Sequence, residues 1–444
     1  MNFTRKKYLV RVLKLVLVII LTLGFSQCAK SPTESESLQK RSALVEVEES
    51  NFVPTEITTN DCDDGVQPSG ALYRICMPNL WNNDLVVWAH GYTDPQEPLS
   101  IPDEEIGGFT LSEIVNLLGY AFATTSYRAN GLVVPDAVED LAELVDIFIG
   151  DYTAPEHVYL VGASEGGLIT ALSIEQYPEK FSGGLATCGP VGDFPTQLNY
   201  FGDFRTLFNY FFPDVLPGSP VDIPKEIMDY WDSVYEQKVK DAIHRNQNAT
   251  EQLFRVTGAP FDPWDLTTIE QTVLGALRYN VFATNNAVEK LGGQPFDNSN
   301  RIYKGSEDDF QLNRKVQRFR PDQTALDEIE ARYQTSGFLD IPLVTLHTTK
   351  DEIVPYWHEP RYSWKVFGSG SSSLHTNMSV YRYGHCNFEV EEVLAAFAVL
   401  VLYVTTQELV VPEKILADAD SRSQFLELAR EYGAQPKIVV RSAM

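Results

Sequence analysis

Short apolar runs alternate with longer amphipathic stretches over the first half of the chain. The runs have the length and the β-branched and aromatic content of buried strands, and they span 71–78, 85–90, 120–127, 158–161 and 181–188. The stretches between them repeat apolar residues at helical spacing, and they span 110–118, 136–149 and 168–177. This alternation predicts an α/β fold, a doubly wound and mostly parallel sheet with helices on both faces.

The alternation stops at about residue 190 and resumes at about residue 340. The intervening segment is rich in aromatic residues and prolines, and its clearest amphipathic stretches are 227–243, 268–282 and 323–332. We interpret residues 190–340 as a helical cap inserted between two strands of one sheet. Strands are again expected at 341–347 and 378–383, helices at 356–366, 389–405 and 421–432. The sheet domain therefore comprises 51–189 and 341–444.

The amino terminus has a different pattern. Residues 1–28 carry five basic residues and no acid, and the apolar run 15–25 is followed by Cys28. A basic segment before a short apolar run is typical of an export signal, and a cysteine at the cleavage region is typical of a bacterial lipoprotein. We expect lipidation at Cys28, with 29–50 as a polar tether; ordinary cleavage nearby and an uncleaved anchor helix are the alternatives. The protein is then exported, held at the bacterial cell envelope or secreted.

Composition limits the partners. The formal net charge is −26 over 444 residues, so nucleic acid is not an expected partner, because binding it needs a basic surface. The sequence contains no evident metal-ligand cluster or phosphate-binding loop, so no cofactor and no metal are expected. We expect the protein to contact a membrane only through the N-terminal anchor. The other expected partner is a small-molecule or acyl substrate.

One motif points to chemistry. Residues 158–161 end at Gly162-Ala163-Ser164-Glu165-Gly166, and a helical stretch follows. A G-x-S-x-G turn between a strand and a helix holds a serine in a strained conformation that exposes its hydroxyl as a nucleophile. The alternative is an ordinary glycine-rich turn. The catalytic interpretation of Ser164 therefore depends on partners elsewhere in the chain.

A nucleophilic serine needs a base, and the base needs an acid that fixes its tautomer. In a doubly wound sheet both should follow later strands, in the order serine, acid, histidine. His385 follows the last predicted strand directly, and Asp351 follows the strand before it, with Glu352 as the neighbouring competitor. Asp351 could instead be an acid that caps the next helix.

The oxyanion of an acyl-transfer reaction needs two hydrogen-bond donors. One is expected from the backbone N–H of Glu165, the residue after the nucleophile. The other is expected from the loop that follows the strand ending at His90, and we assign it to the backbone N–H of Tyr92.

Four cysteines remain besides Cys28. In an exported protein an even number favours disulfides, although buried free thiols are the alternative. Cys62 with Cys76 would close a short loop, and Cys188 with Cys386 would join two loops near the predicted site. Four cysteines allow three connectivities, and the sequence does not choose among them.

Taken together, the Ser164 turn, the His90-Gly91 loop, the Asp351-x-x-Val354-Pro355 segment and Gly384-His385 resemble the α/β-hydrolase superfamily. The resemblance covers about residues 70–190 and 340–405, and it implies Ser164 as nucleophile, Asp351 as acid and His385 as base. The His385-Cys386 pair is also similar to that of tannase and feruloyl esterase-like enzymes. Those enzymes carry the partner cysteine beside the nucleophile, where this chain has Ala163, so no subfamily is assigned.

The function that we expect is hydrolysis of an ester through an acyl-enzyme. A serine peptidase of the aminopeptidase or prolyl-oligopeptidase type is the alternative, with acids of the cap such as Asp193, Asp203 or Asp214 binding a free amine. A protein that keeps the hydrolase fold and only binds its ligand is a third interpretation.

Overall fold

The computed structural model describes residues 61–102, 104–106 and 109–407. The expected export signal with Cys28, the tether and the helix at 421–432 lie outside the described residues.

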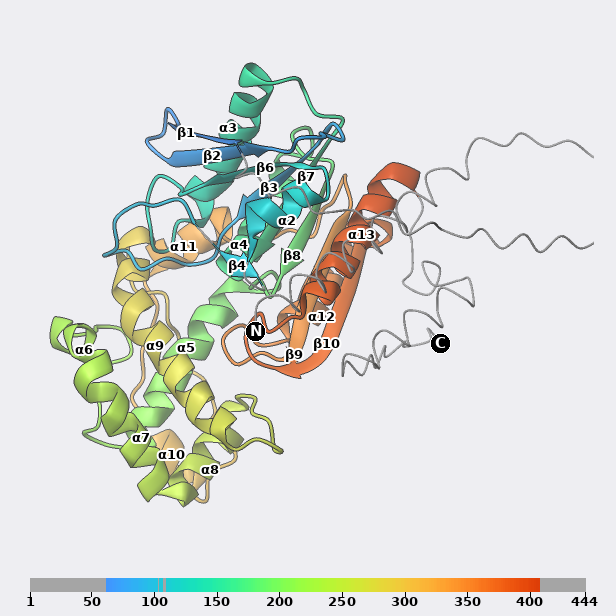
Figure 1. Ribbon diagram of the computed structural model, residues 1–444. Coiled ribbons are helices and arrows are strands. Elements are labelled where there is room, and N and C mark those ends of the chain that lie inside the picture. The colour runs from blue at the N-terminus through green and yellow to red at the C-terminus, as the bar shows by residue number, and fades with distance from the viewer. Residues whose placement is uncertain (1–60, 103, 107–108, 408–444) are drawn as a thin grey trace, which may run out of the picture.

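An eight-stranded sheet forms the centre of the molecule (Figure 1). Its strand order is β1-β2-β6-β3-β7-β8-β9-β10. The strands span Asp61–Val66 (β1), Leu72–Met77 (β2), Asp84–Ala89 (β3), Ala121–Thr125 (β6), His157–Ala163 (β7), Gly183–Thr187 (β8), Leu343–Lys350 (β9) and His375–Tyr383 (β10). In the part of the sheet ordered β6-β3-β7-β8-β9-β10, all neighbouring strands are parallel. The pairs β1 with β2 and β2 with β6 are antiparallel. The predicted fold class, a mostly parallel α/β sheet, is confirmed.

Helices cover both faces of the sheet, as apolar strands buried on both sides require. One face packs against α3 (Val134–Asp151) and α4 (Glu165–Gln176), whose residues Leu141, Leu144 and Leu168 are fully buried. α12 (His358–Ser369) adds Tyr362 and Val366 to the same core. The other face packs against α2 (Leu111–Leu117) and α13 (Val390–Thr406). Within the described residues, no helix is long and apolar enough to span a membrane.

The residues between β8 and β9 form a helical insertion. Its helices are α5 (Phe194–Phe211), α6 (Lys225–Asp229), α7 (Glu236–Arg245), α8 (Gln247–Thr257), α9 (Thr267–Lys290), α10 (Asp309–Lys315) and α11 (Gln323–Arg332). They gather on one side of the molecule, below the sheet in Figure 1. The insertion has an apolar core of its own, which includes Phe204, Phe208 and Trp231. Most of the aromatic residues in this segment therefore stabilise the insertion itself.

Several predicted boundaries inside the insertion were wrong. The single helix expected at 227–243 is divided into α6, a π-helical turn at Trp231–Tyr235 and α7, because Tyr230 leaves the helical conformation at φ −117° and ψ 18°. The helix expected at 268–282 continues to Lys290. The sequence analysis also missed β1, α5, α8 and α10.

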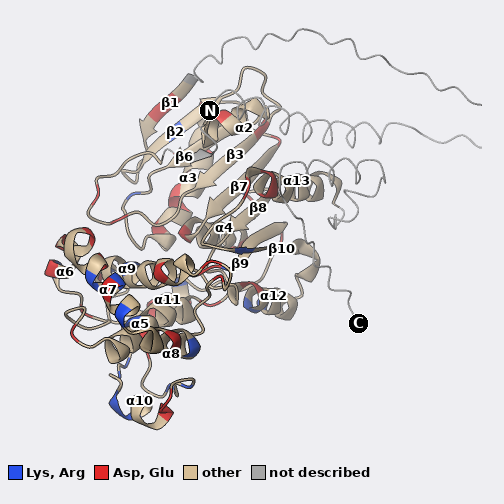
Figure 2. Cartoon of the chain, turned by 60° about the horizontal axis from the view of Figure 1, so that its bottom comes forward, with Lys and Arg blue, Asp and Glu red and all other residues tan. Residues whose placement is uncertain are grey.

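Charged residues are more frequent on the helices of the insertion than on the central strands of the sheet. In Figure 2 the colours of acidic and basic residues mark the insertion helices α6, α7, α8 and α10, whereas β3, β6, β7 and β8 contain almost no such residues. Because the insertion begins directly after β8, it lies at the carboxyl ends of the parallel strands. Loops of different strands meet there, so this edge is the place to examine for a site.

Candidate active site

Ser164 lies between β7 and α4 in a strained conformation. Its backbone has φ 59° and ψ −122°, a region that residues with a side chain rarely adopt. Such strain costs about 1 to 3 kcal/mol and persists only where the surrounding structure imposes it. The backbone N–H of Ser164 donates to the Thr187 carbonyl at 2.9 Å, which fastens the turn to the end of β8.

Close backbone packing imposes this turn. A Cβ at Gly162 would lie 2.2 Å from the Gly166 carbonyl oxygen, and a Cβ at Gly166 would lie 2.0 Å from the carbonyl oxygen of Ala89. Both contacts are much shorter than van der Waals distance, so only glycine fits at these two positions. The glycines therefore let α4 begin directly above the end of β3.

His385 and Asp351 come to Ser164 from the ends of the last two strands. Tyr383 of β10 pairs with Lys350 of β9, so the loops after the two strands begin side by side. His385 Nε2 lies 2.8 Å from Ser164 Oγ, and His385 Nδ1 lies 2.8 Å from Asp351 Oδ2. If Nδ1–H donates to the carboxylate, Nε2 is left as the acceptor for the serine hydroxyl. The geometry is that of a nucleophile, a base and an orienting acid.

Asp351 is fully buried, and its carboxylate accepts several hydrogen bonds. Its Oδ1 accepts hydrogen bonds from the backbone N–H groups of Ile353 and Val354, at 2.9 and 2.8 Å. Burial by itself would raise the pKa of Asp351, but the His385 charge and hydrogen bonds from His347 and His385 hold that pKa well below its usual range. The carboxylate therefore stays ionised and can stabilise a protonated His385.

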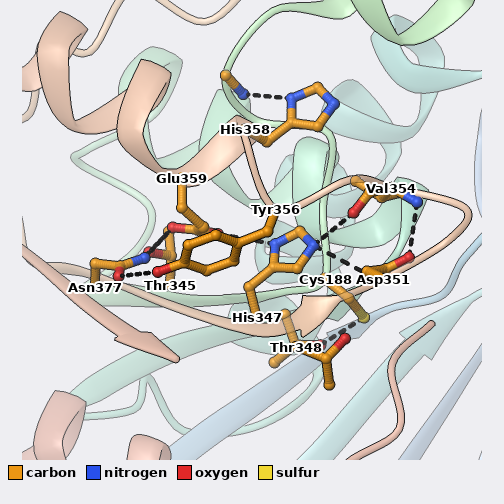
Figure 3. Close-up of polar contacts among 12 residues, drawn as sticks. Cys188, Thr345, His347, Thr348, Asp351, Val354, Tyr356, His358, Glu359 and Asn377 are labelled. Atoms are coloured by element: carbon orange, nitrogen blue, oxygen red, sulfur yellow. Dashed lines mark hydrogen bonds and ion pairs between the residues drawn. The ribbon is translucent and has the colours of Figure 1, made fainter. Parts of the chain in front are cut away.

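His347 lies between Glu359 and the Asp351 loop, as Figure 3 shows. Its Nδ1 lies 3.0 Å from Glu359 Oε1, and its Nε2 lies 2.8 Å from the Val354 carbonyl and 3.4 Å from Asp351 Oδ2. Burial would lower the pKa of His347, but the hydrogen bonds with Asp351 and Glu359 raise it to about 10. A buried imidazolium between two carboxylates thus holds the loop that carries Asp351.

Glu352, the neighbouring candidate for the acid, does not contact the imidazole ring by a hydrogen bond among the described interactions. Burial, followed by the charge of Asp351, raises the pKa of Glu352 to about 7. Its Oε2 is buried without a hydrogen-bond partner in the described part of the chain. Geometry therefore favours Asp351 over Glu352 as the partner of His385.

The loop after β3 passes directly beside the serine. A Cβ at Gly91 would lie 3.3 Å from Ser164 Cβ and 3.9 Å from its Oγ, so Tyr92 follows within reach of the site. Glu165 is the first residue of α4, and its N–H has no acceptor inside that helix. The positions of Tyr92 and Glu165 are thus compatible with the expected oxyanion donors, whose roles remain a proposal.

The Glu165 side chain is buried in the same region. Its Oε1 accepts a hydrogen bond from the Val133 N–H at 3.2 Å, while Oε2 has no partner among the described residues. Burial raises the pKa of Glu165 to about 8, so the carboxyl is mostly protonated at neutral pH. The side chain therefore adds little negative charge beside Ser164.

Comparison with known proteins agrees with this geometry. Residues 129–256 match a family model described as serine aminopeptidase, S33. Together with the sheet order and the strained serine at the β7–α4 turn, this match decides the assignment. The chain has the α/β-hydrolase fold. No curated protein matches this chain significantly.

Several solved structures resemble this α/β-hydrolase at low sequence identity. A puromycin hydrolase is 15% identical with a TM-score of 0.41, over 78% of this chain and 39% of that one. Feruloyl esterase B from Aspergillus oryzae is 12% identical with a TM-score of 0.42, over 76% and 78%. An acylaminoacyl peptidase from Pyrococcus horikoshii is 11% identical with a TM-score of 0.42, over 81% and 44%. The chain thus spans about two fifths of the length of the puromycin hydrolase.

The chain contains two disulfides, and they correspond to one of the three connectivities that the sequence left open. Cys62 pairs with Cys76, and Cys188 pairs with Cys386. The first joins the edge strand β1 to β2. The second joins the end of β8 to the residue after His385, and Cys386 Sγ lies 3.5 Å from His385 Nε2. A covalent link therefore fixes the loop that carries the histidine.

Two groups of potential metal ligands occur among the described residues of the hydrolase. Cys188, His385 and Cys386 form one, but both sulfurs are bonded to each other and cannot act as thiolates. Asp84, Glu156 and His157 form the other at the beginning of β3 and β7, the edge opposite Ser164. There Asp84 Oδ1 already bonds the backbone N–H and the ring of His157.

A histidine outside the predicted site, His358, has a clear structural role. His358 is buried, and its Nδ1 accepts hydrogen bonds from the backbone N–H groups of Gly192 and Asp193, at 3.0 and 3.3 Å. Its Nε2 lies 2.8 Å from Gln197 Oε1 and donates to it. Burial holds the pKa of His358 well below its usual value. A neutral His358 thus fastens α12 to the beginning of the insertion.

Proposed function

We propose that this hydrolase cleaves an ester bond through an acyl-enzyme, with Ser164 as nucleophile, His385 as general base and Asp351 as the orienting acid. The observation that carries the proposal is the continuous set of hydrogen bonds from Ser164 Oγ through the His385 ring to Asp351, at 2.8 Å on each side. The strained backbone of Ser164 supports it, because such strain is common where a side chain must face a substrate.

The proposed reaction can be followed through the transfer of protons between Ser164, His385 and the leaving group. Ser164 Oγ attacks the carbonyl carbon while its proton passes to His385 Nε2, and the ionised Asp351 stabilises the imidazolium. The backbone N–H groups of Glu165 and Tyr92 donate to the oxyanion. His385 then gives its proton to the leaving alcohol, and the acyl group stays on Ser164. A water molecule attacks the acyl-enzyme by the same steps in reverse order and releases the acid.

The main alternative is a serine peptidase, which the match to the S33 family model supports. An aminopeptidase needs an acid that is free to bind the substrate amine. Asp193 instead caps α5 and pairs with Arg361 at 3.0 Å, and Asp203 pairs with Arg301 and accepts the Tyr303 hydroxyl at 2.5 Å. Asp214 is exposed. None of these three is a free buried acid, and the buried carboxyls nearer the site, Glu165 and Glu352, have raised pKa values that favour their neutral forms. We therefore favour the ester substrate.

The test uses the purified protein without its N-terminal segment and two classes of substrate. A fluorophosphonate probe should label Ser164, and short p-nitrophenyl esters should be hydrolysed faster than aminoacyl anilides. Ser164→Ala should abolish both labelling and turnover. Hydrolysis of anilides without hydrolysis of esters would favour the peptidase, and failure to label Ser164 would favour a protein that only binds its ligand.

We also propose that the protein is exported and anchored at the cell envelope through lipidated Cys28. The two disulfides support an oxidising compartment, in which such bonds persist. Intact-mass analysis of the mature protein tests this proposal: a diacylglyceryl-modified cysteine at its N-terminus is expected. An unmodified mature chain that begins elsewhere would contradict the lipoprotein assignment.

A further inference from the structure

Two peptide groups hold the Asp351 carboxylate in place. The N–H groups of Ile353 and Val354 both donate to Asp351 Oδ1, at 2.9 and 2.8 Å. Each N–H shares its peptide group with the carbonyl of the preceding residue, so these carbonyls belong to Glu352 and Ile353. In a trans peptide the N–H and the C=O point in opposite directions. A donor at each carbonyl oxygen therefore aligns the N–H at the other end with Asp351.

The insertion supplies both of these donors from one helix. The hydroxyl of Tyr200 donates to the Glu352 carbonyl at 2.8 Å. Gln197 Nε2 donates to the Ile353 carbonyl, also at 2.8 Å. Tyr200 and Gln197 lie three residues apart on α5, so they project from the same face of that helix. Because a carbonyl oxygen can only accept, the direction of both hydrogen bonds is fixed, and α5 reaches Asp351 through two peptide groups.

His358 fixes the orientation of the Gln197 amide. His358 Nδ1 faces two backbone N–H groups at the beginning of the insertion, so it must accept, and Nε2 carries the proton. Nε2–H then donates to Gln197 Oε1 at 2.8 Å, which leaves the amide nitrogen directed at the Ile353 carbonyl. A continuous row of hydrogen bonds thus runs from His358 through Gln197 and one peptide group to Asp351.

We propose that Tyr200 and Gln197 are positioning residues, which hold the Asp351 carboxylate in the orientation that the catalytic histidine requires. The proposal rests on the acyl-enzyme mechanism proposed above. With Oδ1 held by two aligned N–H groups, Oδ2 is left 2.8 Å from His385 Nδ1. Hydrogen bonds in a row also polarise one another, so the donors of α5 strengthen the bonds that the peptide groups make to the carboxylate. Neither side chain exchanges a proton in the reaction.

This arrangement gives the insertion a part in the reaction that differs from covering the site. The same loop is held from the sheet by His347, whose Nε2 lies 2.8 Å from the Val354 carbonyl. Side chains of the sheet and of the insertion therefore bind the three successive carbonyls of residues 352–354. If α5 moved away as a lid does, two of these bonds would break and Asp351 would lose its orientation. We therefore expect α5 to stay in place during turnover.

The first variant that tests this is Tyr200→Phe, which keeps the ring and lacks only the hydroxyl that binds the Glu352 carbonyl. Its kcat should fall by roughly 10-fold, less than the roughly 100-fold that a displacement of about 1 Å can cost, because Gln197 still holds the next peptide group. KM should stay close to that of the wild type, since Tyr200 acts on the acid and not on the substrate. Tyr235→Phe is the matched control: it removes another tyrosine hydroxyl of the insertion, one that bonds Glu226 at 3.1 Å, and should leave kcat unchanged.

A double-mutant cycle with Asp351→Asn tests whether Tyr200 acts through the carboxylate. Hydrolysis of p-nitrophenyl acetate is measured for Tyr200→Phe, for Asp351→Asn and for the double variant, after subtraction of the rate of Ser164→Ala and at a temperature at which all variants are folded. Once the carboxylate is absent its orientation no longer matters, so Tyr200→Phe should cause no further loss of kcat in the Asp351→Asn background. Gln197→Met, which lacks the amide and fills a similar volume, should behave in the same way.

The cycle has outcomes that contradict the proposal. A loss of kcat by the same factor in both backgrounds would overturn it, because Tyr200 would then affect the rate by a route that does not involve Asp351. An unchanged kcat, or a change confined to KM, would overturn it as well. If the wild type neither labels at Ser164 nor hydrolyses esters, the proposed function fails; if the wild type is active and Tyr200→Phe has the same kcat, this inference alone fails.

Discussion

Removing the Cys188–Cys386 disulfide should reduce both the stability of the protein and its proposed esterase activity. The bond joins the end of β8 to the residue after His385, across a sequence separation of 198 residues. Without it, the His385 loop is held by its flanking strand β10 and by hydrogen bonds such as that from the Thr348 hydroxyl to the Gly384 carbonyl, at 2.7 Å. The imidazole then samples positions in which it no longer meets Ser164 Oγ.

The expected magnitudes follow from the sequence separations of the two disulfides. Loss of loop-closure entropy over 198 residues corresponds to at most about 5 kcal/mol of unfolding free energy, against about 3 kcal/mol for the 14-residue separation of Cys62 and Cys76. Measured losses are commonly about 2 to 4 kcal/mol. For catalysis, a displacement of about 1 Å at a reacting group can cost roughly 100-fold in rate. We expect kcat to fall by at least about 10-fold.

The assay compares two double variants, Cys188→Ser with Cys386→Ser and Cys62→Ser with Cys76→Ser. Unfolding by denaturant gives the stability of each, and ester hydrolysis is measured at a temperature at which both are fully folded. Both should be destabilised, but only the first should lose kcat. If the variant without Cys188–Cys386 loses stability and keeps the wild-type kcat, the disulfide does not position His385 and the reasoning is wrong.

Three other substitutions test the structure of the site. Ser164→Ala should leave the free energy of unfolding within about 1 kcal/mol and lower kcat by roughly 10⁴-fold or more, measured by denaturation and ester hydrolysis. Because the pKa of Glu165 is raised in the folded state, its ionisation destabilises the fold as pH rises from about 4.5 to about 8. Glu165→Gln should therefore gain stability relative to the wild type across this pH range, by at most about 5 kcal/mol. A difference in unfolding free energy between variant and wild type that does not change with pH would refute this reasoning. The pKa of His347 is raised to about 10 in the folded state, so its charge stabilises the protein fully below about pH 6.5 and this effect is lost as pH rises to about 10. His347→Gln should therefore be less stable than the wild type at pH 6.5. Its denaturation midpoint should also depend less on pH than that of the wild type, up to about pH 9.5.

The sheet and its helices could be predicted because each element has a local pattern. The runs at 85–90 and 158–161 are apolar throughout, as strands buried on both faces require, and they became β3 and β7. Asp351 and His385 could be nominated because parallel strands end at one edge, whatever the details of packing. The structure places both beside Ser164 for that reason, through the pairing of Tyr383 with Lys350.

Other elements could not be predicted because their stability comes from partners distant in sequence. β1 reads DCDDGV, which resembles a turn more than a strand, and it forms by pairing with β2 and through the Cys62–Cys76 bond. α5 is rich in aromatic residues, which have only moderate helix propensity. A local signal was present all the same: Asp193 caps the helix and a proline follows at its first turn.

The Ser164 site thus combines residues of two kinds. Ser164, Asp351 and His385 are positioned by backbone that leaves a strand, so their relation is built into the sheet and could be predicted from strand order. Tyr279 of the insertion packs against Tyr92 of the loop after β3 through the register of α9 and its stack on Phe201, which no local pattern encodes. The insertion therefore contacts the loop that passes beside Ser164. Changes in the insertion near Tyr279 should alter which esters are hydrolysed and how fast, while the order of proton transfers, which depends on the sheet, stays the same.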